Sequence, residues 1–114
     1  EIKIKVSKSG GKQIALNKVK ECKGINKFVG LIFKRREKAS ILLFNIKNQA
    51  IHSLFVFFPF IAVWLNKRNE VVSLRIVKPF KFHVKPQQTF SKLIEIPLNK
   101  KYKALSKKLL NFRR

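Results

Sequence analysis

The strongest constraint on the fold is one apolar run. Leu54 to Leu65 reads LFVFFPFIAVWL, which is 12 residues without a charge. A helix needs about 20 apolar residues to span a bilayer, so we expect no transmembrane segment here. The β-branched and aromatic content, with no alternation of polar residues, instead predicts a strand that is buried on both faces. Pro59 lacks a backbone N–H, so it should divide the run in two or lie at a bulge.

Period-two alternation of apolar and polar residues predicts further strands on both sides of this run. Residues 66–70 form a polar stretch, NKRNE, that predicts a hairpin turn. Short strands with turns between them indicate a mainly β, single-domain β sandwich or barrel-like sheet. The predicted strands are Ile2–Val6, Ile14–Cys22, Ile41–Phe44, Val72–Ile76, Phe80–Lys85 and Ile94–Leu98.

Two segments favour helices. Ile25, Phe28 and Ile32 are spaced by three and four, which predicts a short helix near residues 24–33. In the tail, residues 99–114, three leucines would share one helical face, so the tail is either a basic helix docked on the sheet or a frayed end. Because 114 residues supply one core, we expect one β-rich domain over 1–98, followed by this basic tail.

The charge is strongly one-sided. Lys and Arg total 27, Asp and Glu total 5, and the net charge is +22 with no Asp at all. A genome rich in A and T would explain the lysines but not the missing acids, because Asp and Glu also have A/T-rich codons. Such a surface favours polyanions such as RNA, DNA or anionic lipid, although it can also serve solubility alone. The apolar and aromatic content excludes a disordered chain. The sequence contains no Met, so we expect a processed form or a piece of a longer protein.

We take RNA as the favoured partner and an acidic protein as the alternative. Lysines would contact phosphates, which position a nucleic acid without reading its sequence. Alternation around Phe80 should bury one set of side chains and expose the other, so only the lysines there are assigned to the surface. The assigned polyanion-binding residues are Lys78, Lys81 and Lys85, and in the tail Lys100, Lys101, Lys103, Lys107, Lys108, Arg113 and Arg114.

Three ordered stretches, which begin with GLIFKR at residue 30, IHSLFVFFP at residue 51 and KPF at residue 78, resemble the domain of unknown function 192 family in its archaeal-like branch. Residues 30–35, GLIFKR, are similar to the family's Gly-Leu-Met-Phe-Arg, and 51–59, IHSLFVFFP, to its Ile-His-Thr-Phe-Phe-Met and Phe-Pro blocks. Residues 78–80, KPF, and 93–97, LIEIP, are similar to its Lys-Pro-Trp and Val-Leu-Glu-Leu-Pro. The resemblance covers roughly 19–98 and implies a compact, mostly β sandwich with a short helix. It implies no reaction, because the family's biochemical function is not established.

The chain departs from the family pattern at two acids. Ile61 stands where the family usually has Asp, and Asn66 stands where the family strand ends in Asp. Any chemistry that depends on those carboxylates is therefore absent here. Asn suits tight turns as well as Asp does, so we favour a structural role for Asn66.

Glu95 and His52 are the candidates for a small-ligand or enzymatic pocket. Glu95 is the one acid in a predicted strand within a family motif, where it either is buried with a raised pKa or faces solvent beside a lysine. His52 begins the apolar run and either contacts a ligand or bonds the backbone. We assign no catalytic residue, metal or cofactor, because Cys22, His52 and His83 lack paired short spacing. The lone cysteine and the motif style favour the cytoplasm, with a lost N-terminal signal as the alternative.

Overall fold

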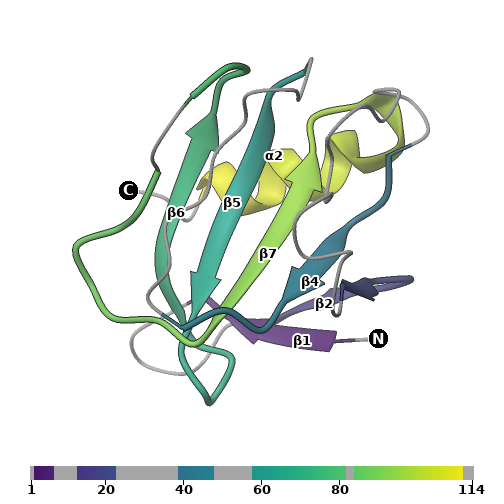
Figure 1. The fold of residues 1–114 in the computed structure, drawn as a ribbon. Helices are drawn as coiled ribbons and strands as arrows, with labels where there is room; N and C mark the ends of the chain where they lie inside the picture. The colour runs from purple at the N-terminus through teal and green to yellow at the C-terminus, as the bar shows by residue number, and fades with distance from the viewer. Residues whose placement is uncertain (1, 7–12, 23–38, 48–57, 82–83, 112–114) are drawn as a thin grey trace.

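A computed structural model describes residues 2–6, 13–22, 39–47, 58–81 and 84–111. The described part is mainly β, as predicted, with two sheets and a C-terminal helix (Figure 1). The two-stranded sheet pairs β1 (Ile2–Lys5) with β2 (Gln13–Leu16). The five-stranded sheet contains β3 (Lys20–Cys22), β4 (Leu42–Phe44), β5 (Phe60–Leu65), β6 (Val71–Val77) and β7 (Lys92–Pro97).

The five-stranded sheet has the order β3-β4-β7-β5-β6. Its pairs are antiparallel except β3 with β4, which is parallel. All six residues of β5 are buried, so the prediction of a strand covered on both faces is confirmed there. Pro59 directly precedes β5, where its missing N–H removes no bond from the ladder. The first half of the apolar run, 51–57, lies outside the described residues.

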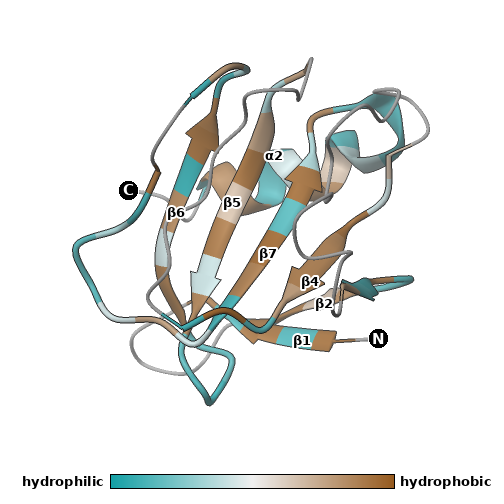
Figure 2. Ribbon diagram, viewed as in Figure 1, coloured by the Kyte–Doolittle hydropathy of each residue, from teal (hydrophilic) through white to brown (hydrophobic). Residues whose placement is uncertain are grey.

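Two hydrophobic layers cover the sheet, one on each face. The β1–β2 hairpin and the C-terminal helix cover one face, where Ile4, Leu16 and Leu109 pack on Ile61 and Ile94. On the other face an aromatic layer includes Phe58, Phe60, Trp64 and Phe90. Figure 2 shows the apolar character of the central strands on which both layers rest. The two layers explain why β5 and β7 carry almost no solvent-exposed positions.

The tail forms η2 (Lys100–Tyr102) and α2 (Lys103–Asn111), so the C-terminal helix is confirmed. Asn99 Oδ1 accepts a hydrogen bond from the backbone N–H of Tyr102 at 3.1 Å and so caps the first turn. Leu105, Leu109 and Leu110 face the sheet, and Leu109 is 0% exposed. The division of the chain at residues 98 and 99 stays a prediction.

Two predicted strands are wrong in extent. Residues 14–22 do not form one strand, because Lys18 has a φ of 56° and separates β2 from β3, which lie in different sheets. In the predicted strand 80–85, Phe80 has a φ of 65° and lies in a turn, Val84 forms an isolated β-bridge, and residues 82 and 83 lie outside the described residues. Phe80 is also 56% exposed, so it lies at the surface together with its neighbouring lysines.

The remaining expectations concern closure, membranes and the first helix. Within the described strands, β3 and β6 are the two edges of an open sheet, so no barrel closes. Among these same residues, no helix has the length and apolar character needed to cross a membrane. The helix predicted near 24–33 and the turn at 9–11 lie outside the described residues.

Candidate functional site

The described lysines assigned to polyanion binding are all exposed. Those of the segment after β6 are Lys78, Lys81 and Lys85, and those of the tail are Lys100, Lys101, Lys103, Lys107 and Lys108. Arg113, Arg114 and His52 lie outside the described residues, so their positions stay predictions. The exposure of the lysines places their side chains at the surface that an approaching anion would meet.

The tail lysines are concentrated because of how α2 packs. Its leucines are turned toward the sheet, while Lys103 and Lys107, one turn apart, lie on the exposed side together with Lys100 of η2. We call these three lysines the α2 basic face. It borders a cleft of about 490 Å³, and residues 99–111 contain no acid that could neutralise it. The other residues lining the cleft are Leu98, Asn99, Ser106 and Leu110.

The hairpin turn between β5 and β6 is held by the side chain of Asn66. Asn66 Oδ1 accepts hydrogen bonds from the backbone N–H groups of Arg68 at 2.9 Å and Glu70 at 3.0 Å. Asn66 Nδ2 donates to Glu70 Oε1 at 2.8 Å. Asn69 takes the positive φ of 62° that the turn requires, a conformation that Asn tolerates. The structural role favoured for Asn66 therefore agrees with the hydrogen bonds that it makes.

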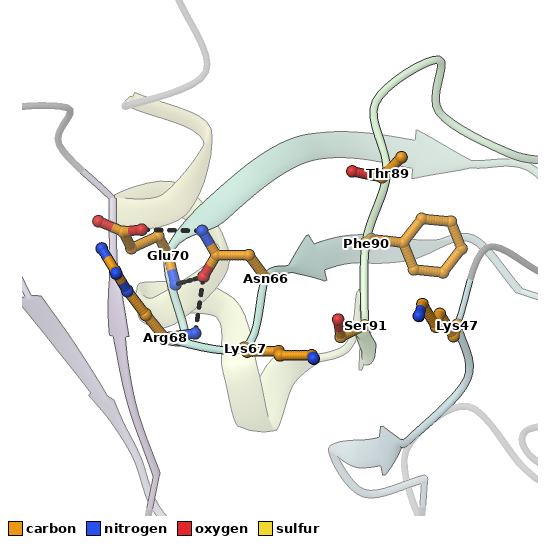
Figure 3. Close-up of a pocket in the computed structure, with 8 residues that line it drawn as sticks. All are labelled: Lys47, Asn66, Lys67, Arg68, Glu70, Thr89, Phe90 and Ser91. Atoms are coloured by element: carbon orange, nitrogen blue, oxygen red, sulfur yellow. Dashed lines mark hydrogen bonds between the residues drawn. The ribbon is translucent and has the colours of Figure 1, made fainter.

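A second cleft, of about 300 Å³, lies beside this turn (Figure 3). Lys67 extends from the turn toward Ser91, while Arg68 points to the opposite side, toward Glu70. Phe90 is buried behind the cleft and meets Trp64 edge to face, with 6.2 Å between ring centroids. The residues lining the cleft are Lys47, Asn66, Lys67, Arg68, Glu70, Thr89, Phe90 and Ser91.

Sequence reasoning identified the turn but missed the cleft. Lys47, Thr89 and Ser91 come from two segments that are distant in sequence from Asn66, and none of the three belongs to a motif. The backbone N–H of Ser91 donates to the carbonyl of Leu65 at 2.9 Å, which brings these segments together. Only the sheet order, with β7 beside β5, predicts this juxtaposition.

Glu95 is buried in the aromatic face of the sheet. It is 7% exposed, and the register places Leu42 on one side of it and Ala62 on the other. Burial removes the carboxylate from water and raises the pKa of Glu95 from its ordinary 4.5 to about 8. The sequence left Glu95 either buried or facing solvent beside a lysine, and the structure shows that it is buried.

Two further polar side chains belong to the same face of the sheet as Glu95. Arg75 of β6 pairs with Ala62 of β5, which pairs on its other side with Glu95. The guanidinium carbon of Arg75 lies 5.7 Å from the centre of the Trp64 ring. Trp64 is diagonal to Glu95 in the ladder, and its buried Nε1 has no hydrogen-bond partner among the residues that the structure describes. A buried acid and an unsatisfied indole N–H are costly in an apolar layer, so this cluster is a second candidate site.

Metal ligation has no geometric basis in this part of the molecule. Among the described residues, no three His, Cys, Asp or Glu side chains come close enough to hold an ion. Cys22 is buried in the aromatic layer and forms no disulfide, since it is the one cysteine of the chain.

Comparison with known proteins gives one informative similarity. The chain is 30% identical over 76 residues to a UPF0127 protein of Pyrococcus furiosus, across 64% of this chain and 65% of that protein. The chain thus spans somewhat less than two thirds of that relative. No protein-family model matches the chain, and no solved structure matches it. The similarity links the chain to a conserved but uncharacterised type of protein, whose name specifies no substrate.

Proposed function

We propose that this protein is a non-enzymatic binding domain for polyanions, with RNA as the favoured ligand. The observation that carries the proposal is the α2 basic face. The helix uses its leucines to dock on the sheet, so its lysines are held on a rigid support rather than on a loose tail. Residues 99–111 contain no acid, so no carboxylate of the same segment offsets the positive charge of these lysines.

The chemistry of the lysines also defines how an RNA would be held. Lysine is a point charge that suits phosphate oxygens, so binding would depend strongly on salt and weakly on base sequence. The cytoplasm is the compartment that suits this ligand and a chain with a single, buried cysteine. We also propose membership of the domain of unknown function 192 family, which the motif resemblance and the Pyrococcus furiosus relative support.

The proposal is tested by fluorescence anisotropy with single-stranded RNA, duplex RNA and heparin at several salt concentrations. The variant Lys103→Gln/Lys107→Gln should bind RNA more weakly, with a log K versus log salt slope reduced by about 0.7 for each phosphate that the protein no longer neutralises. Lys3→Gln/Lys20→Gln removes the same charge from β1 and β3 and should leave the slope nearly unchanged.

Other outcomes would contradict the proposal. Equal losses of affinity in the two double variants would show that net charge alone drives the binding. Equal affinity for RNA and heparin would show a generic polycation. Co-purification of an acidic protein that survives nuclease treatment, without RNA binding, would support the alternative partner.

A second candidate function, recognition of a small ligand, is favoured by the cluster around Glu95. The Nε1 of Trp64 lacks a hydrogen-bond partner among the described residues, and Glu95 is buried diagonally to it in the ladder, so a ligand could contact both. Trp64 is the one tryptophan of the chain, so its fluorescence reports on this site directly. A small-molecule screen should yield compounds that change this fluorescence in the wild type but not in Glu95→Gln. Finding none, or finding equal responses in both proteins, would remove this candidate.

A further inference from the structure

We propose that the cleft beside the Asn66 turn is a phosphomonoester site that holds the phosphorylated end of an RNA strand or the phosphate of a free mononucleotide. The inference rests on the proposed function and adds a specific site to it. The α2 basic face would attract any polyanion, whereas this cleft would recognise one terminal phosphate.

The walls of the cleft are fixed before any ligand arrives. Besides the three side-chain bonds of Asn66, its backbone N–H donates to the carbonyl of Glu70 at 3.0 Å, and that of Asn69 donates to the carbonyl of Asn66 at 3.1 Å. Asn69 is tied to β7 by the Lys92 ammonium, which donates to its Oδ1 at 2.7 Å. The opposite wall is tied by the bond from Ser91 N–H to Leu65. A preorganised cleft loses little entropy on binding.

The side chains that border the cleft include hydrogen-bond donors that no described residue engages. Within the part of the chain that the structure describes, no hydrogen bond or ion pair engages the side chains of Lys47, Lys67, Thr89 or Ser91. They provide two ammonium groups and two hydroxyls, and both kinds of group bind phosphate oxygens. Arg68 points away from Ser91 and contributes only its longer-range charge (Figure 3).

Charge and size favour a monoester over an internal phosphodiester. A phosphomonoester carries a charge of about −1.5 to −2 at pH 7, so it can use both Lys47 and Lys67, whereas a diester carries one charge. The carboxylate in the cleft lining, Glu70, is engaged by Asn66 Nδ2 at 2.8 Å. A volume of about 300 Å³ accommodates a phosphate with its sugar and is too small for a duplex.

The test compares one RNA oligonucleotide in three forms, with a 5′-phosphate, with a 3′-phosphate and with hydroxyls at both ends. A nucleoside 5′-monophosphate and the matching nucleoside are titrated in parallel by calorimetry. We expect one phosphorylated form to bind about tenfold more tightly than the hydroxyl form. This factor corresponds to the free energy of about one hydrogen bond to a charged group. Lys47→Gln/Lys67→Gln should remove this difference. Arg68→Gln, which removes a charge from the same turn, should retain it.

The outcomes separate this inference from the proposed function. Equal affinity for all three oligonucleotides, with no binding of the monophosphate, would overturn the cleft assignment and leave RNA binding intact. Binding of the monophosphate that Lys47→Gln/Lys67→Gln abolishes, without any RNA binding, would support the cleft and overturn the proposed function. Equal losses of affinity in the double variant and in Arg68→Gln would also overturn the inference, because the site would then be only an electrostatic patch. Equal urea midpoints exclude misfolding, since both lysines are exposed.

Discussion

Replacing Glu95 by Gln should change how the stability of the protein depends on pH. In the folded protein the pKa of Glu95 is raised to about 8 from its ordinary 4.5, so the folded state keeps a proton that the unfolded state loses. The contribution of Glu95 to the free energy of unfolding should therefore be highest below pH 4.5 and fall as the pH rises toward 8. At about 1.4 kcal/mol per pH unit for one proton, the loss over this window is about 5 kcal/mol. Gln is neutral and nearly isosteric, so Glu95→Gln should lack this loss.

The measurement is urea unfolding from pH 4.5 to pH 8, followed by the fluorescence of the buried Trp64. The difference between the wild-type and Glu95→Gln curves isolates Glu95 from every other titrating group. Glu21→Gln is the matched control, because it removes a negative charge from an exposed carboxylate that accepts a bond from Asn45 at 2.9 Å. Parallel wild-type and Glu95→Gln curves across the window would refute the argument that Glu95 is buried in its neutral form.

Two further substitutions test the turn and the helix. Asn66→Asp should destabilise the protein by about 1–3 kcal/mol at pH 7, because the donor to Glu70 becomes a second carboxylate at that contact, and adding Glu70→Gln should restore the urea midpoint. An undiminished midpoint in Asn66→Asp would show that the bond contributes nothing. Leu109→Ala should cost about 2–5 kcal/mol in the same assay, because Leu109 is 0% exposed between α2 and the sheet. A cost near zero would mean that α2 is not docked in solution.

The sequence predicts a strand well where its pattern of apolar residues is compatible with only one secondary structure. β1, β4, β6 and β7 follow from their apolar content, and the buried β5 follows from a run that is too short for a membrane and too apolar for alternation. The misassigned segments depend on backbone angles instead. Lys18 and Phe80 adopt positive φ values, which are uncommon for these residue types and which no composition pattern indicates.

The candidate site was less predictable because it depends on which strands are neighbours. Exposure of the lysines follows from their charge alone, and the turn at Asn66 follows from its polar stretch. The cleft joins Lys47, the turn and Ser91, and only the position of β7 beside β5 brings these segments together. The burial of Glu95 has the same cause, since a central strand has no solvent face on which to place it.

The strand order also governs how the chain can fold during its synthesis. β7 lies between β4 and β5, yet it leaves the ribosome after both of them. Until residue 97 has emerged, the edges of β4 and β5 that β7 will pair have no strand to complete them, and the β5 edge is almost entirely apolar. Such an unpaired edge can associate with other nascent chains. The intermediate is therefore prone to aggregation until β7 pairs with β4 and β5.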